Sequence, residues 1–209
     1  MAELQAVSND LVARLRARAG DTAIDDDESS RALVSDDVYA RGARVLAVAR
    51  PASTEMLSDI VSEATAAGCA VLPRGGGMSY TGGYVSDRAD AIVIDMAAMN
   101  RVLEINREDM TVTVECGCTW AALHEALKGT GLRTPFWGTL SGLRATVGGG
   151  LSQNSIFWGS GQFGSAADCV LSLQMVLADG TILDTGSAAQ RNATPFFRHF
   201  GPDLTGVFT

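Results

Sequence analysis

The sequence predicts an α+β fold, because helical segments and short apolar strands follow one another without the regular alternation of a βαβ array. Apolar residues recur at helical spacing over residues 2–20, after Pro51 and over residues 119–128. Ser53 or Thr54 is expected to cap the second of these helices. The strands that we expect are residues 69–73, 91–95, 101–105, 111–115, 170–177 and 181–183, with Asp179-Gly180 as the turn of the last pair.

Composition and charge favour a globular protein and argue against two classes of partner. Apolar residues make up 46 % of the chain and charged residues 19 %, which is typical of a folded domain. The net charge of −8 argues against nucleic-acid binding, which requires clustered Lys and Arg. No apolar run is long enough for a membrane span, and the N-terminus lacks the pattern of a secretory signal. We therefore expect a cytoplasmic protein.

The first 45 residues are expected to form an N-terminal helical extension and an acidic linker. The linker is assigned to residues 21–30, which contain the acidic run Asp25 to Glu28. A run of like charges is typical of a solvated, mobile loop.

Cysteine and histidine are too sparse for a metal site to be expected. Cys116 and Cys118 lie two positions apart, but no Cys or His pair stands near them at the spacing of a zinc site. His124 and His199 are the two histidines of the chain. The cysteines are therefore expected to be small, buried apolar side chains.

A glycine-rich segment, residues 71–83, is the strongest functional signal. Three consecutive glycines, residues 75–77, follow a predicted strand, and two more stand after four intervening residues. Glycine has no Cβ and lets the backbone approach a ligand, and successive N–H groups in such a turn can bind an anion. Hydroxyl and guanidinium donors stand in the same segment, at Arg74, Ser79 and Thr81. An anion-binding loop for a diphosphate and a plain surface turn both remain open from this segment alone.

A nicotinamide site of the Rossmann type is not expected, because residues 82–87 carry no helix start after the loop. A second glycine-rich segment covers residues 138–165, where eight of 28 positions are glycine. A long flexible loop is one interpretation, although loops of this length without secondary structure are uncommon unless they bind something. Two such segments favour an extended ligand, and FAD has a diphosphate between adenosine and a ring system.

The two segments, in this order, resemble the FAD-contacting segments of FAD-linked oxidases of the vanillyl-alcohol oxidase type. Residues 73–83 resemble that family's pyrophosphate loop, and residues 145–154 with 163–168 resemble its second FAD-contacting stretch. Residues 170–180 match the strand and turn that follow. The subgroup with the strongest resemblance comprises the glycolate oxidase and D-lactate dehydrogenase-like enzymes. The resemblance covers about residues 45–209 and implies a PCMH-type FAD-binding domain of two α+β subdomains with FAD between them.

The resemblance also implies how FAD is held. Some relatives attach the flavin through a histidine directly after the three glycines, but Met78 stands there, so we expect non-covalent FAD. Asp168 is expected only to tie down its loop. The FAD-binding residues that the resemblance implies are Arg74, Gly75, Gly76, Gly77, Met78, Ser79, Tyr80, Thr81, Gly82, Thr139, Ser141, Gly142, Thr146, Gly148, Gly149, Ser152, Asn154, Gly164 and Ser165.

Domain boundaries and a reaction follow from the same resemblance. Subdomain 1 is expected at about residues 46–110 and subdomain 2 at about residues 111–209, incomplete at its C-terminal end and without a substrate domain. The implied reaction is oxidation of a 2-hydroxy acid of the lactate or glycolate type, with hydride transfer to flavin N5. The catalytic residues are expected in the absent C-terminal half. Three hypotheses stay open: part of such an oxidoreductase, a flavin-binding subunit completed by a partner chain, and a product that no longer binds flavin.

Overall fold

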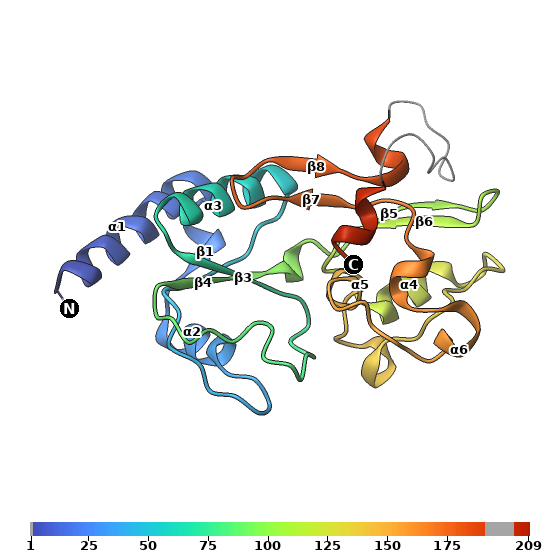
Figure 1. Cartoon of the computed structure of the whole chain (residues 1–209), viewed down its shortest axis with the longest axis horizontal. Coiled ribbons are helices and arrows are strands. Elements are labelled where there is room, and N and C mark those ends of the chain that lie inside the picture. The colour runs from blue at the N-terminus through green and yellow to red at the C-terminus, as the bar shows by residue number, and fades with distance from the viewer. Residues whose placement is uncertain (1, 191–202) are drawn as a thin grey trace. The chain divides into compact units, whose positions relative to one another are not determined.

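The computed structural model describes residues 2–190 and 203–209, and the chain divides into two compact units. Unit 1 comprises Met1–Ala98 and Val176–Ile182, and unit 2 comprises Met99–Met175 and Leu183–Thr209. Figure 1 shows the elements of both. No helix of the described residues is long and apolar enough to cross a membrane.

Unit 1 is built on a four-stranded sheet with the order β1-β2-β4-β3. The central strand β4 (Ala91–Asp95) pairs in parallel with β2 (Ala47–Ala49) and β3 (Ala70–Arg74), and the short β1 (Ile24–Asp25) pairs antiparallel with β2. Ala91 to Ile94 are at most 1 % exposed. An apolar run of this kind is typical of a parallel strand that is covered on both faces.

Three helices cover the sheet of unit 1, with α2 (Glu28–Ser35) on one face and α1 (Ala2–Ala19) and α3 (Thr54–Ala66) on the other (Figure 1). Strand residues alternate between the faces. The α2 face accordingly holds a core of Val34, Val45, Val48, Ala91 and Val93. The predicted N-cap is confirmed for Ser53, whose hydroxyl accepts a hydrogen bond from the Met56 N–H at 3.2 Å.

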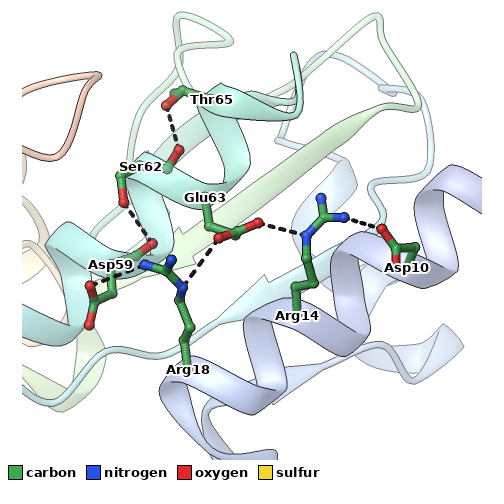
Figure 2. Close-up of polar contacts among 7 residues, drawn as sticks. All are labelled: Asp10, Arg14, Arg18, Asp59, Ser62, Glu63 and Thr65. Carbon is green, nitrogen blue, oxygen red and sulfur yellow. Dashed lines mark hydrogen bonds and ion pairs between the residues drawn. The ribbon is translucent and has the colours of Figure 1, made fainter.

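Charged side chains join α1 to α3, as Figure 2 shows. Glu63 of α3 accepts contacts from two arginines of α1, Arg14 at 2.6 Å and Arg18 at 3.2 Å. Arg14 also pairs with Asp10 on its own helix, and Arg18 lies 3.5 Å from Asp59. The Glu63 side chain is only 16 % exposed, so its contacts are less screened than those of an ordinary surface pair.

The expected mobile acidic linker is wrong, because residues 21–30 fold into elements of unit 1. Asp27 is the N-cap of α2 and accepts a hydrogen bond from the Ser29 N–H at 2.9 Å. Asp25 lies in β1 and pairs with Arg50 at 2.9 Å. A hydrogen bond from the Ser30 hydroxyl and one from Arg50 lower the pKa of Asp25 to about 2. The acidic side chains are therefore used in caps and pairs, and they do not mark a solvated loop.

Unit 2 contains the antiparallel pair β5 (Val102–Asn106) and β6 (Thr111–Val114) and the helix α4 (Trp120–Leu127). Arg101 and the buried Glu115 close the base of the hairpin, with the Arg101 side chain 2.6 Å from Glu115 and its N–H 2.7 Å. The remaining elements of the chain are α5 (Val147–Leu151), α6 (Ser160–Phe163), β7 (Gln174–Val176), β8 (Ile182–Asp184), η1 (Asp21–Ala23), η2 (Met96–Ala98), η3 (Thr139–Gly142), η4 (Ala166–Cys169), η5 (Gly186–Ala189) and η6 (Leu204–Val207).

The two units differ from the expected subdomain boundaries. The expected division between residues 110 and 111 falls inside the β5–β6 hairpin, whose strands are held together by backbone hydrogen bonds. Residues 176–182, the tip of the β7–β8 hairpin, belong to unit 1 because the Gly180 carbonyl accepts a hydrogen bond from the Ser58 hydroxyl of α3. The N-terminal segment is likewise part of unit 1 rather than a separate extension.

We expect Glu63→Gln to lower the free energy of unfolding by about 1 kcal/mol, because two guanidinium groups lose a partly buried charged acceptor. Asp10→Asn is the matched control. The Asp10 side chain is 63 % exposed, and of the two arginines it pairs only with Arg14. Its expected effect is below about 0.5 kcal/mol. Urea denaturation measures both, and equal losses in the two variants would contradict this assignment.

Candidate functional site

The first glycine-rich segment follows β3 in unit 1, at the carboxyl end of a parallel strand. The register pairs Arg74, the last residue of β3, with Asp95 at the end of β4. Residues 82–87 contain no helix, as the sequence predicted, and neither does the rest of the segment between residues 75 and 90. Loops at the carboxyl ends of parallel strands are the usual position for ligand-binding residues in such sheets.

The loop after β3 presents unpaired backbone donors. No backbone N–H from Gly76 to Tyr80 donates a hydrogen bond to another described residue. Gly77 has φ +65°, and a Cβ there would lie 2.3 Å from the Arg74 side chain. The positive φ favours glycine at residue 77, and a side chain there would also displace the end of the Arg74 side chain. A loop that binds a diphosphate needs several free N–H groups to donate to the anion, and this loop has them.

Arg74 lies beside these donors and has no anionic partner in the part of the chain that the structure describes. Its guanidinium carbon is 5.3 Å from the centroid of the buried Tyr84 ring, and the Tyr84 hydroxyl donates to the Gly77 carbonyl at 3.2 Å. The Arg74 Nε atom is buried and has no hydrogen-bond partner among the described residues. A guanidinium whose Nε is buried and unpaired, with no anion beside it among the described residues, is suited to a ligand that brings one.

Hydroxyl groups occupy the second half of the loop. The Ser79 and Thr81 hydroxyls lie 2.9 Å apart, and the Thr81 N–H donates to the Ser79 hydroxyl at 3.3 Å. Gly82 has φ +71°, a conformation that favours glycine. The predicted residues 74–82 form one continuous stretch, in which the free N–H groups of residues 76–80 overlap the hydroxyls of Ser79 and Thr81.

In unit 2 the predicted residues near Thr146 are anchored to the turn at residues 116–118 before α4. The Val147 and Gly148 N–H groups donate to the carbonyls of Cys118 and Cys116 at 2.8 and 2.9 Å. A Cβ on Gly148 would lie 2.6 Å from the Cys116 Cβ. The buried Thr146 caps α5 by accepting a hydrogen bond from the Gly149 N–H at 3.1 Å. Several glycines here are thus required by internal packing.

The predicted residues Thr139 and Ser141 line an open groove of about 550 Å³ within unit 2. Leu140 and Ser141 have φ +50° and +57°, a left-handed conformation that is uncommon outside glycine and often marks a functional site. Trp158 is 87 % exposed at this groove. The full lining is Trp137, Gly138, Thr139, Leu140, Ser141, Ile156, Phe157 and Trp158.

The last predicted stretch is tied down by Asp168, as expected. Its carboxylate accepts hydrogen bonds from the Ser165 N–H at 2.7 Å and the Ser165 hydroxyl at 2.9 Å. Gly164 has φ +80°, and a Cβ there would lie 2.3 Å from Asp168. Asn154 accepts a hydrogen bond from the Ala167 N–H at 3.2 Å. Ser152 is exposed at the end of α5, and its hydroxyl donates to the Gly149 carbonyl.

Cysteine and histidine do not gather into a site in the described part of the chain. No group of three or more His, Cys, Asp or Glu side chains is placed to hold a metal ion there. Burial raises the pKa of Cys69 to about 11 and also raises that of Cys116, so neither thiol is activated. His124 packs edge-on against Trp137 with ring centroids 4.7 Å apart. His199 lies outside the described residues.

Sequence reasoning missed the aromatic lining of the groove and a turn near the glycine loop. Phe157 and Trp158 lie in the second glycine-rich segment and Trp137 directly precedes it, but no spacing rule links them, since Trp137 and Trp158 meet through an antiparallel bridge. Tyr39 packs on Tyr80 from a segment that the sequence assigned to an extension. Non-local contacts of this kind leave no periodic signal.

Comparison with known proteins identifies the family. A family described as "FAD binding domain" matches residues 45–186, which is more than half of the chain. The chain belongs to this family of FAD-binding domains. The predicted family and its cofactor FAD are therefore confirmed, whereas non-covalent attachment and the individual contact residues stay predictions.

The curated relatives are longer than this chain. It is 33 % identical over 153 residues to the uncharacterized FAD-linked oxidoreductase YgcU of Escherichia coli K12, covering 73 % of this chain and 31 % of the relative. It is 30 % identical to D-2-hydroxyglutarate dehydrogenase of Xanthomonas citri pv. viticola, covering 74 % and 32 %. It is 28 % identical to glycolate oxidase subunit GlcD of Bacillus subtilis, covering 97 % and 42 %. The chain thus spans about a third to two fifths of these relatives.

A solved structure gives the same fold. 4-Ethylphenol oxidase from Gulosibacter chungangensis matches with a TM-score of 0.80 at 22 % identity, over 97 % of this chain and 40 % of that one. This likeness confirms the predicted α+β fold of the PCMH type. At such an identity it carries no further argument about activity.

We expect Gly148→Ala to lower the free energy of unfolding by about 2 kcal/mol, because the new Cβ would overlap the Cys116 side chain and carbonyl. Gly161→Ala in α6 is the control, since a Cβ there meets nothing within 4 Å. Its expected effect is within about 0.5 kcal/mol of zero, because alanine favours the helix. Thermal and urea unfolding distinguish the two, and a neutral Gly148→Ala would overturn this account of the glycine.

Proposed function

We propose that this chain is the FAD-binding part of a flavin-dependent oxidoreductase that oxidises a 2-hydroxy acid by hydride transfer to flavin N5. The printed names of two relatives, D-2-hydroxyglutarate dehydrogenase and glycolate oxidase subunit GlcD, support a 2-hydroxy acid as substrate. FAD supplies the redox chemistry when bound, and the protein holds the cofactor and sets its surroundings.

The observation that carries the proposal is the loop after β3, with its free donors and unpaired guanidinium. The N–H groups of Gly76 to Tyr80 have no internal acceptor, and Arg74 Nε has no partner among the described residues. In this proposal the N–H groups bind one side of the FAD diphosphate and Arg74 neutralises part of its charge. Ser79 and Thr81 add hydroxyl donors at the end of the loop.

Residues of unit 2 are proposed to contact the rest of the cofactor. The groove lined by Thr139, Ser141 and Trp158 offers both hydroxyl groups and aromatic surface. Hydroxyls suit the ribityl chain and aromatic faces suit a flat ring. The proposed attachment is non-covalent, because Met78 directly follows the three glycines and a thioether does not form the histidyl link of some relatives.

The groups that bind the substrate are proposed to lie outside this chain. The chain spans less than half the length of these relatives, so in this proposal the remaining part of such a protein supplies the substrate ligands. The acidic composition agrees with a partner that is a small molecule and not a nucleic acid. A cytoplasmic location is part of the same proposal.

We expect Arg74→Gln to weaken FAD binding about tenfold, because the diphosphate loses a partly buried counter-charge. Arg88→Gln is the matched control in the same unit, since it removes the same charge from a guanidinium that is already paired with Asp90. Flavin fluorescence titration gives both dissociation constants. A native chain that takes up no FAD would refute the cofactor role, and equal weakening in the two variants would refute the role of Arg74.

The substrate class is tested on a complete protein that includes this chain. Anaerobic mixing with a D-2-hydroxy acid is expected to bleach the oxidised flavin band, whereas the matching 2-oxo acid is not, because only the alcohol carries a hydride to transfer. Glycolate, D-lactate and D-2-hydroxyglutarate form the test panel. If none of them reduces the flavin while a phenol does, the 2-hydroxy-acid proposal is wrong.

A further inference from the structure

A short turn outside the matched FAD-binding residues contacts the glycine loop within unit 1. Residues 36–41 form this turn, which we call the N-terminal turn, and they precede the matched range 45–186. A bridge between Asp36 and Arg41 closes the turn, and the Asp37 N–H donates to the Ala40 carbonyl at 3.0 Å. The turn is therefore a defined element and not a loose connection.

The Asp37 carboxylate joins the N-terminal turn to the end of the glycine loop. Its Oδ1 atom accepts hydrogen bonds from the N–H groups of Tyr39 at 2.7 Å and Ala40 at 2.6 Å. Its Oδ2 atom is buried, makes no hydrogen bond of good geometry to a described residue and lies 4.0 Å from where a Cβ on Gly82 would stand. The N–H groups of Ala40 and Tyr39, together with that of Gly82, hold the pKa of Asp37 below its usual value. The carboxylate is thus ionised and faces the loop.

An aromatic pair makes the second contact. The rings of Tyr39 and Tyr80 lie edge to face, with centroids 6.3 Å apart and an interplanar angle of 74°. Tyr39 is 80 % exposed and Tyr80 is 53 % exposed, so neither ring is held by burial. Tyr80 is a predicted FAD-binding residue, and among the described residues its ring packs against that of Tyr39.

The base of the N-terminal turn is fixed to the chain that follows the loop. The Ala43 N–H donates to the Ser86 carbonyl at 2.7 Å. A Cβ on Gly42 would lie 2.6 Å from the Ser35 carbonyl oxygen and 2.7 Å from that of Ser86. Backbone that approaches this closely leaves no room for sliding, so the turn is held at a set position relative to residues 82–86.

We propose that the N-terminal turn positions the glycine loop for the cofactor's diphosphate, with Asp37 and Tyr39 as positioning residues. This inference rests on the proposed FAD-binding function. The free N–H groups of Gly76 to Tyr80 act on one anion only if they are held in place, and few hydrogen bonds within the loop do so. A loop that is already ordered loses less entropy when it binds, which strengthens binding.

Amide hydrogen exchange of the cofactor-free chain tests the positioning directly, and FAD titration tests its effect on binding. Tyr39→Ala is expected to speed exchange at residues 75–83 about fivefold, because the loop opens more easily. It is expected to raise the FAD dissociation constant about tenfold. Tyr39→Phe keeps the ring pair and should restore both values. Unchanged exchange at Ala91 to Ile94 of β4 shows that the fold is intact.

Val38→Ala is the matched control, since Val38 lies next to Tyr39 in the same turn and is 69 % exposed. It should change neither measurement. The positioning role is overturned if Tyr39→Ala leaves loop exchange equal to that of Val38→Ala, even if FAD binding weakens, because Tyr39 would then contact the cofactor itself. Failure of the native chain to bind FAD is a different result, which refutes the proposed function.

Discussion

The parallel pairing of β3 with β4 is the interaction on which the candidate site depends. Five residue pairs, from Ala70 with Ala91 to Arg74 with Asp95, fix where β3 ends and hence where the glycine loop begins. β4 is buried on both faces and has Asp90 directly before it and Asp95 at its end, so a shift along the strand would move a carboxylate toward the buried region. The sheet can therefore carry a loop that has few hydrogen bonds of its own. Stability lies in the strands, and the unpaired donors of the loop remain free for a ligand.

The charges of unit 1 show the same separation between stability and binding. Arg50 pairs with Asp25 and Arg88 pairs with Asp90, so both guanidinium groups are satisfied within the protein. Arg74 has no ion pair among the described residues, although its Nε atom is buried. Leaving such a group without an anion costs free energy in the free protein. The cost is understandable at a position where a bound diphosphate supplies the missing charge, and it would have no purpose in a plain turn.

Local signals in the sequence predicted the elements that are long or well capped, and non-local contacts account for the rest. The helix after Ser53 and the strand at residues 91–95 carry a cap and an apolar run, and both form as predicted. The strands β1 and β2 have two and three residues, too few for any pattern, and they exist only through pairing in the sheet. The acidic run at residues 25–28 does not form a solvated loop, because Asp25 pairs with the distant Arg50 and Asp27 caps α2, and charge pattern alone predicts neither contact.

A high glycine content alone does not identify the ligand-binding residues. The conformation of each glycine and the atoms around it distinguish a binding glycine from one that is required by packing. In the second glycine-rich segment, a Cβ on Gly138 would lie 2.3 Å from Trp120, and one on Gly159 would lie 2.1 Å from the Pro135 carbonyl. These glycines are required because the chain packs against itself, which would hold with or without a cofactor. In the loop after β3, by contrast, the N–H groups beside Gly77 have no acceptor among the described residues. Free donors, and not the absence of side chains, are therefore the feature that separates a ligand-binding glycine loop from a tightly packed one.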